Sequence, residues 1–489
     1  MARAMILAAA ISLAIACGPS SVVAQPAPTP PSFATSGNAE FDAWRDDFAR
    51  RAVGRGRDPA VLGRLLNGIT PDPRIVELDQ RQPEFVSPVW DYVTNRVTER
   101  RLNDGRALKS SIGSTLDAVE ARYGVPSGII VGIWGLESNY GDAALNYQAA
   151  AALSTLAFEG RRREQFEGYL LALTEMVERG LAEPAQLNSS WAGALGQPQF
   201  MPDVYLTTAV DWDGDGHRDI WNNRGDVAAS IGNYLQDRGW QRGQPVFDEV
   251  RLPNNFDYAL ADGTSRTVAD WAARGVTRID GQAWGDGALQ SQLFLPAGAQ
   301  GPALLLHPNF GVIRRYNNSD RYALVVALLG RALDGGASTL VRSWPTQIGS
   351  LNREQTLELQ TLLNGMGYDA GPADGLFGSG TRRAVRAFQA AQNLPADGFP
   401  TETLLNEVRA RAGVAVAPEA AREPRGLDRS GIRELQRLLN RQGYSAGTAD
   451  GVIGTRTRNA IRAFERARGL EVRGRATDVV LEAARAAGG

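Results

Sequence analysis

Apolar residues recur at helical spacing through most of the first 333 residues. Four stretches show this most clearly: 116–123, 129–136, 169–177 and 227–235. A period near 3.6 residues predicts helices with a buried face. Residues 246–300 differ, because short alternating pieces are separated by Asp-Gly, Asn-Asn and Gly-Asp turns. They predict a small loop- and β-rich insertion within a mainly α domain.

An internal repeat fills the C-terminal part of the chain, and its second copy follows the first by 76 residues without a gap. The matches include Leu359-Gln360 with Leu435-Gln436, Gly367-Tyr368 with Gly443-Tyr444, and Ala373-Asp374-Gly375 with Ala449-Asp450-Gly451. The apolar spacing predicts three short helices in each copy. Between the first two helices, a D-G-x-x-G-x-x-T stretch predicts a turn that closes on a helix N-cap at or near Thr381.

Segments without periodicity separate these parts. Residues 335–350 and 412–426 break the helical pattern and are predicted to be linkers. They divide the chain into a large domain, residues 41–334, and two modules, residues 351–411 and 427–489. Residues 25–40 are rich in Pro, Ser, Thr and Ala, a composition typical of a flexible tether.

The N-terminus has the features of an export signal. An apolar run over residues 6–16 is too short to span a bilayer but long enough for a signal-peptide core. Val22-Val23-Ala24 resembles a signal-peptidase site, which would make residues 1–24 the signal peptide. Alternatively, the residues ending at Cys17 resemble an imperfect lipobox, and a lipid on Cys17 would attach the protein to the outer membrane. Both alternatives predict export, and we expect a periplasmic protein.

Composition and charge exclude several classes of function. The net charge of −2 does not favour binding to nucleic acid. Cys17 is the only cysteine, so no internal disulfide can form. Two histidines and one cysteine are too few for a typical zinc site. We expect a monomer without an organic cofactor.

One carboxylate is predicted to lie on an apolar helix face. The helix is expected to begin at Pro126 and end near Gly141, and Glu137 shares a face with Ile133 and Trp134. Poor solvation and an unfavourable helix dipole would both raise the pKa of this carboxyl group. A group that stays protonated near neutral pH can protonate a glycosidic oxygen. The alternative is a Glu at a helix end whose carboxylate simply reaches water.

A second acidic cluster has the spacing of a calcium loop. Residues 211–219 carry carboxylates at positions 1, 3, 5 and 9 and a glycine at position 6, as in the first half of an EF-hand. The predicted ligands are Asp211, Asp213, Asp215 and the backbone carbonyl of His217. Asn222 stands where an EF-hand has its closing Glu, so the spacing leaves the last ligand open. The alternative to a stabilising Ca²⁺ is a turn in which Asp side chains bind backbone amides.

Four ordered pieces of the large domain resemble the membrane-bound lytic murein transglycosylase B family. They are LDQRQPEF at 78–85, GLES at 135–138, SWAGALGQPQFMP at 190–202 and NFGVIRRYN at 309–317. Ser138 departs from the family, which has Thr there. The resemblance covers residues 41–333 and implies a lysozyme-like helical fold.

The two repeat copies resemble the peptidoglycan-binding type 1 module over essentially their whole length. This resemblance implies binding to wall peptide or glycan. For the individual Asp, Gly and Thr positions of the turn, the alternative is that they only shape the loop.

The transglycosylase resemblance implies a reaction with one essential carboxylate. Glu137 would protonate the oxygen that links N-acetylmuramic acid to N-acetylglucosamine, and would then act as base on the muramoyl C6 hydroxyl. That hydroxyl attacks its own anomeric carbon and leaves a 1,6-anhydro sugar. Most glycosidases use two carboxylates, whereas here groups of the substrate replace the second.

The resemblance also implies substrate and metal contacts. The implied substrate-binding residues are Ser190, Gln199, Tyr316, Asn317, Arg161, Arg162 and Tyr92. The arginine pair suits lactyl or peptide carboxylates. Gln165 stands where we expect an aromatic residue, which puts that subsite in doubt. Asp226 would close the Ca²⁺ loop, although the segment before it is one residue longer than expected.

Two other functions compete with the transglycosylase. A lysozyme-type muramidase would let water complete the reaction on the same glycan strands of peptidoglycan. A non-catalytic wall-binding scaffold would keep the modules and dispense with Glu137. The digestion products distinguish a muramidase from a transglycosylase, because only the transglycosylase forms the anhydro sugar. Substitution of Glu137 distinguishes a scaffold from an enzyme, because a scaffold would not be affected.

Overall fold

The computed structural model describes residues 29–80, 88–346, 348–349, 351–414 and 426–487. The chain forms two compact units, Met1–Val408 and Arg409–Gly489. The predicted signal peptide, with Cys17, and most of the predicted linker 412–426 lie outside the described residues. Among the helices of the described part, none is long and apolar enough to cross a membrane.

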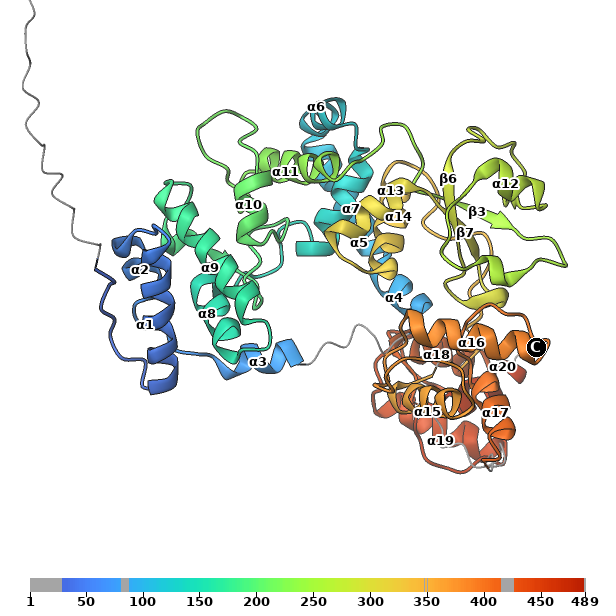
Figure 1. Cartoon of the computed structure of the whole chain (residues 1–489). Coiled ribbons are helices and arrows are strands. Elements are labelled where there is room, and N and C mark those ends of the chain that lie inside the picture. The colour runs from blue at the N-terminus through green and yellow to red at the C-terminus, as the bar shows by residue number, and fades with distance from the viewer. Residues whose placement is uncertain (1–28, 81–87, 347, 350, 415–425, 488–489) are drawn as a thin grey trace, which may run out of the picture. The chain divides into compact units, whose positions relative to one another are not determined.

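Helices dominate the large domain, as predicted (Figure 1). Up to the sheet, the elements are α1 (Ala39–Gly54), α2 (Pro59–Leu66), α3 (Pro73–Gln80), α4 (Val89–Arg96), α5 (Glu99–Ser111), α6 (Gly113–Tyr123), α7 (Ser127–Ser138), β1 (Tyr147–Gln148), α8 (Ala149–Glu159), α9 (Arg163–Glu178), η2 (Pro184–Gln186), β2 (Asn188–Ser189), α10 (Pro202–Thr208) and α11 (Arg224–Asp237). After the sheet, α13 (Pro308–Tyr316) and α14 (Asp320–Leu333) complete the domain.

The predicted insertion is confirmed as a five-stranded antiparallel sheet with the order β4-β6-β7-β3-β5. Its elements are β3 (Phe247–Arg251), η3 (Tyr258–Leu260), β4 (Arg266–Thr267), α12 (Val268–Ala273), β5 (Thr277–Arg278), β6 (Gln290–Phe294), η4 (Gly298–Gln300) and β7 (Ala303–Leu306). The sheet has its own apolar cluster around Trp271 and Leu305. It extends further along the chain than the predicted end at residue 300, because β7 ends at Leu306.

Helix α7 packs directly on α14, and two glycines of α7 allow the close approach. A Cβ atom on Gly128 would overlap the carbonyl oxygen of Gly330, and one on Gly132 would lie 3.2 Å from the carbonyl oxygen of Val326. The residues of α7 from Ser127 to Gly135 are all buried. The most apolar helix of the domain therefore carries its C-terminal end, with Glu137, against a rigid neighbour.

Each repeat copy folds into three helices, as predicted. They are α15 (Arg353–Gly365), α16 (Ser379–Ala391) and α17 (Glu402–Arg411) in the first copy, and α18 (Arg429–Arg441), α19 (Thr455–Ala467) and α20 (Asp478–Ala486) in the second. The predicted N-cap at Thr381 is wrong, because α16 begins at Ser379 and is capped by Gly378. Thr381 is buried instead, and its hydroxyl accepts from Gln360 Nε2 and donates to the carbonyl of Ala370. A buried hydroxyl needs such partners more than an exposed helix end needs this cap.

The described parts of the predicted tether and of the first predicted linker pack on the large domain. Phe33 contacts the domain core and lies under the Arg45 guanidinium, 4.6 Å from its ring centroid. Leu340 is buried in the same core. The buried carboxylate of Glu249 accepts from the backbone amides of Val341 and Arg342 at 2.7 and 2.8 Å. The described parts of both segments therefore have no helical periodicity, but single side-chain and backbone contacts attach them to the large domain.

Candidate active site

The chain turns sharply directly after Glu137. Helix α7 ends at Ser138, before the position that Gly141 suggested. Asn139, Tyr140 and Gly141 follow with φ angles of +50°, +63° and +94°. Positive φ is costly for residues with a side chain, so the surrounding structure must hold this turn.

Packing of the Tyr140 ring holds the turn. Its hydroxyl donates to the carbonyl of Arg101 at 2.9 Å, and burial raises the pKa of Tyr140 to about 12. The ring lies close against Gly135, where a Cβ atom would come within 2.5 Å of Tyr140 Cε1 and Oη. A glycine two residues before Glu137 is therefore required by sterics.

Glu137 is half-buried and is held by a tyrosine of α14. The Tyr322 hydroxyl donates to Glu137 Oε1 at 2.6 Å. Tyr316, at the end of α13, stacks on Tyr322 with ring centroids 6.5 Å apart and an interplanar angle of 13°. Burial, and then the negative charge of Glu137, raise the pKa of both tyrosines well above its ordinary value. Both hydroxyls therefore remain protonated donors.

The sequence did not identify Tyr322. It lies five residues after Asn317, in the same Tyr-rich stretch as the fourth family piece. Its helical period places it on a buried face, which is equally consistent with core packing. Only the packing of α7 on α14 brings its hydroxyl to Glu137.

A polar hairpin, residues 189–200, lies beside the Glu137–Tyr322 pair. Backbone bridges connect Ser189 with Leu195 and Leu195 with Phe200, and Ser190 Oγ accepts from the amide of Ala194. Gln199 lies in the turn with φ +54°, and its side-chain Nε2 donates to the carbonyl of Gly196 at 2.8 Å. The Tyr316 hydroxyl donates to the carbonyl of Pro198 at 2.6 Å and so ties the hairpin to α13. Asn317 is exposed as the C-cap of α13.

The remaining predicted substrate residues have partners within the protein. Arg161 binds the buried carboxylate of Asp79 at 2.5 Å, and Arg162 binds its other oxygen. Asp79 belongs to the first family piece, of which residues 81–85 lie outside the described residues, so the arginine pair binds the described start of that piece. Tyr92 is buried on α4, and the Arg96 guanidinium stacks 3.5 Å above its ring. Tyr92 also contributes to the raised pKa of Tyr322, so it belongs to the surroundings of the Glu137–Tyr322 pair.

The acidic loop brings three of its carboxylates together. One oxygen from each of Asp211, Asp213 and Asp226 lies within 4.8 Å of the others. Burial raises the pKa of Asp226, and the charges of Asp213 and Asp211 raise it further. Asp215 is not in this group, and its Oδ1 accepts from the amide of His217, whose side chain is exposed. Three carboxylates at such separations suit a hard divalent cation.

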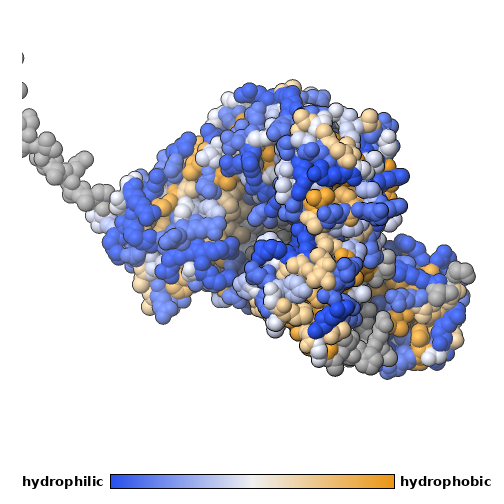
Figure 2. All heavy atoms as spheres, turned by 45° about the vertical axis from the view of Figure 1, so that its right-hand side comes forward, coloured by the Kyte–Doolittle hydropathy of each residue, from blue (hydrophilic) through white to orange (hydrophobic). Residues whose placement is uncertain are grey.

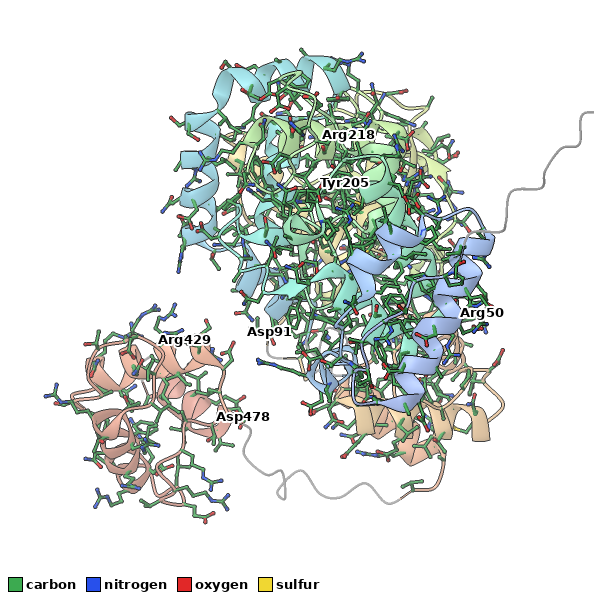
Figure 3. The ribbon with its side chains drawn as sticks, turned by 90° about the vertical axis from the view of Figure 1, so that its left-hand side faces the viewer. Arg50, Asp91, Tyr205, Arg218, Arg429 and Asp478 are labelled. Carbon is green, nitrogen blue, oxygen red and sulfur yellow. The ribbon has the colours of Figure 1, made fainter. Side chains whose placement is uncertain are left out.

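The far end of this loop is anchored on α10. The Tyr205 hydroxyl donates to the carbonyl of Arg218 at 3.0 Å, and both residues are labelled in Figure 3. A cavity of about 700 Å³ lies between the loop and the turn after α7, and its lining includes Ser138, Gln197 and Trp221. Figure 2 shows a hollow in the otherwise largely hydrophilic surface of this unit.

Comparison with known proteins finds family matches in the large domain and in both modules. A family model described as "Transglycosylase SLT domain" matches residues 40–331, and one described as "Putative peptidoglycan binding domain" matches residues 352–407 and 428–483. The membrane-bound lytic murein transglycosylase B of Escherichia coli (strain K12) is 35% identical over 260 residues, which are 52% of this chain and 70% of that protein.

Two solved structures are informative. SltB3 from Pseudomonas aeruginosa, in complex with NAG-anhNAM-pentapeptide, is 42% identical and superposes with a TM-score of 0.73 over 76% of this chain and all of that chain. The Escherichia coli lytic transglycosylase Slt35, in complex with calcium, is 30% identical, with a TM-score of 0.51 over 61% of this chain and 93% of that chain. The family model covers more than half of the chain, and so this protein belongs to the transglycosylase SLT domain family and carries two peptidoglycan-binding modules.

Proposed function

We propose that Glu137 is the acid/base residue with which this chain cleaves peptidoglycan as a lytic transglycosylase. The carboxyl proton passes to the oxygen between N-acetylmuramic acid and N-acetylglucosamine, and the bond from that oxygen to the muramoyl anomeric carbon breaks. The carboxylate then takes the proton of the muramoyl C6 hydroxyl, whose oxygen bonds to the same carbon. The products are a 1,6-anhydromuramoyl end and a free N-acetylglucosamine end.

The observation that carries this proposal is the 2.6 Å bond from Tyr322 to Glu137 beside the polar hairpin. A neutral hydroxyl that donates to the carboxylate fixes its position without neutralising it. In the proposed mechanism the C6 hydroxyl of the substrate replaces the second carboxylate that ordinary glycosidases use. The complex of the similar protein SltB3 with NAG-anhNAM-pentapeptide supports this.

The polar side chains of the hairpin and the aromatic ring of Tyr316 beside them are suited to binding a glycan strand. We propose that Ser190, Gln199 and Asn317 bind sugar hydroxyl and N-acetyl groups and that Tyr316 forms the wall beside them. Tyr92 helps to keep the Tyr322 hydroxyl protonated, because it raises the pKa of Tyr322. Arg161 and Arg162 would bind a substrate carboxylate with the guanidinium N–H groups that Asp79 and Glu159 do not use.

Replacing Tyr322 by Phe tests the positioning of Glu137. We expect kcat to fall roughly tenfold, because loss of a hydrogen bond to a charged group costs about 1.5–3 kcal/mol in part of the reaction cycle. The pH profile of kcat should shift to higher pH, because the carboxylate loses a donor that favours its charged form. A Tyr169→Phe variant serves as the control, since that hydroxyl pairs with Gln165 on α9. An unchanged pH profile in Tyr322→Phe would contradict the positioning role.

We further propose that Asp211, Asp213 and Asp226 hold a stabilising Ca²⁺. The buried position of Asp226 supports this, because a carboxylate buried beside two others is costly unless a cation compensates. Its oxygens also accept from the amides of Trp212 and Asp219, which orders both ends of the loop around it. The ion would supply the charge balance that keeps this loop against α11.

Removal of calcium should lower the thermal midpoint of the first unit. Ca²⁺ at about 100 times its Kd adds roughly 2.7 kcal/mol, which we expect to raise Tm by about 5 °C. Asp226→Asn should abolish this calcium-dependent increment, whereas Asp215→Asn should keep it. The measurement is calorimetry with Ca²⁺ or with a chelator. If Asp226→Asn responds to Ca²⁺ as the unmodified chain does, the proposed ligand set is wrong.

For its location, we propose export to the periplasm, with peptidoglycan glycan strands as the partner and a monomeric chain. The apolar N-terminal run and the two wall-binding modules support this. Labelling with a palmitate analogue would distinguish a lipid on Cys17 from cleavage after Ala24.

A further inference from the structure

The two modules differ strongly in charge. Residues 352–407 carry four arginines against seven acidic side chains, a net charge of −3, whereas residues 428–483 carry eleven arginines against seven, a net charge of +4. A change of sign over a surface therefore points to different partners for the two copies.

Both copies nevertheless keep the same internal framework. Gln360 Nε2 donates to Asp374, to the carbonyl of Leu376 and to Thr381, and Gln436 Nε2 repeats the three bonds 76 residues later. Residues 76 apart therefore occupy the same place in the two modules, and their surfaces can be compared position by position.

One face of the first module is used against the large domain within the first unit. Asp397 Oδ2 accepts from the amide of Ala299 at 2.8 Å, and its Oδ1 accepts from Gln389 at 2.7 Å. Phe399 packs against the core of the large domain, and Arg386 donates to the carbonyl of Ala261.

A small cavity of about 160 Å³ at this contact is lined by residues of both parts. From the module these include Arg353, Leu376 and Arg382, and from the large domain Pro88 and Asp320. The large domain of the same chain therefore covers most of this face of the first module.

The second module keeps the arginines of the docking face, because Arg429, Arg458 and Arg462 stand where the first module has Arg353, Arg382 and Arg386. It carries other residues at three further docking positions. Arg473 and Arg475 replace Asp397 and Phe399, and Glu465 replaces Gln389. A guanidinium cannot accept from a backbone amide, and it cannot enter an apolar core without a large desolvation cost. The second module thus cannot make the contact that fixes the first.

In its place, the second module presents a set of arginines that we call the arginine face. Its members are Arg429, Arg458, Arg462, Arg473 and Arg475, and all of them are exposed. The Arg462 side chain lies against Gly474, between Arg473 and Arg475, and the Arg429 side chain lies against Gly451. Figure 3 labels Arg429 and shows nitrogen-tipped side chains projecting from this unit. Arg473 pairs with Glu471 at 2.6 Å, so the face retains a net positive charge.

We propose that the second module binds the wall through the arginine face, by recognising the carboxylates of peptide stems, while the first module is a fixed part of the catalytic unit. The proposal rests on the wall-binding role proposed above. Carboxylates of the wall lie on its peptide stems rather than on its N-acetylated sugars, and guanidinium groups bind carboxylates in bidentate geometry. Several arginines on one face would favour stems that are not cross-linked, because these carry more free carboxylates.

The test is sedimentation of the full chain with purified sacculi. The variant Arg458→Gln, Arg473→Gln, Arg475→Gln should bind about tenfold more weakly, whereas the control Arg437→Gln, Arg441→Gln, Arg456→Gln loses the same charge from exposed positions outside the arginine face and should bind normally. Binding of the unmodified chain should fall when an amidase has removed the peptide stems, and should weaken with salt. Phe399→Ala should lower Tm without changing sedimentation.

Other outcomes overturn the proposal. Equal loss in the control would indicate a general charge effect, and equal binding to stripped sacculi would assign recognition to the glycan. Binding to vesicles of anionic phospholipid as strong as to sacculi would assign the face to a membrane. Cleavage of soluble glycan fragments is measured in parallel. If the unmodified chain cleaves fragments but does not sediment, wall binding by the modules fails while the role of Glu137 stands.

Discussion

Replacing Glu137 by Gln should lower the rate of peptidoglycan cleavage by about 10³-fold, because general acid and base steps contribute about 10²–10⁴-fold. The amide cannot give a proton to the glycosidic oxygen or take one from the C6 hydroxyl. Its Oε1 can still accept from Tyr322, so the fold should be retained and Tm should change by less than about 2 °C. The measurement is the release of soluble fragments from sacculi, with mass spectrometry of the products.

The product masses also decide between the two catalytic mechanisms. A transglycosylase releases fragments with a 1,6-anhydro end, each lighter by one water than the product of a muramidase. We expect the anhydro form from the unmodified chain. Hydrated fragments alone would identify a muramidase, and full activity in Glu137→Gln would remove Glu137 from the reaction. Glu164→Gln on α9 is the matched control for loss of an acidic side chain.

The second large effect is expected at Gly135, which contacts no substrate in this proposal. Gly135→Ala places a methyl group within 2.5 Å of the Tyr140 ring, and overpacking of this kind costs about 1–3 kcal/mol. The ring must move, and with it the turn that directly follows Glu137. A shift of about 1 Å in an acid/base group can lower the rate about 100-fold. Unfolding in urea and the kinetics of cleavage measure the two effects.

A matched glycine separates this steric effect from helix propensity. Gly311 lies within α13, and a Cβ atom added to it would meet no other atom within 4 Å, so Gly311→Ala should be neutral or stabilising by up to about 1 kcal/mol. Removing the ring by Tyr140→Ala should make a second change at Gly135 nearly free, so the two effects should not add. Additive losses in the double variant would show that Tyr140 is not the group that excludes a side chain at Gly135.

Local pattern was sufficient for most of the fold. The helical period located α6, α7, α9 and α11, the alternating pieces located the sheet, and the 76-residue offset defined two three-helix modules. The helices and strands depend on neighbours within a few residues, and the repeat follows from comparing the sequence with itself. The same locality explains the misplaced cap at Thr381, because a threonine at the start of a helix is equally suited to a cap and to a buried hydrogen bond.

The candidate site was only partly accessible from the sequence. Glu137 lies in an apolar helix and in a family motif, and these two signals point to the same residue. Arg161 and Arg162 matched a substrate-binding pattern, but their partner Asp79 is 82 and 83 residues away in the chain. Nothing in the spacing of either segment indicates that the pair already binds a buried carboxylate.

The sequence by itself determined which helices form, where the modules repeat and which carboxylate lies on an apolar face, because each depends on periodicity or local motif. Only the tertiary structure decided that Tyr322 holds Glu137, that Asp226 and not Asp215 joins Asp211 and Asp213, and that the first module docks through Asp397 and Phe399. These are contacts between segments distant in the chain. They depend on how buried faces pack together, and many sequences with the same period could pack differently.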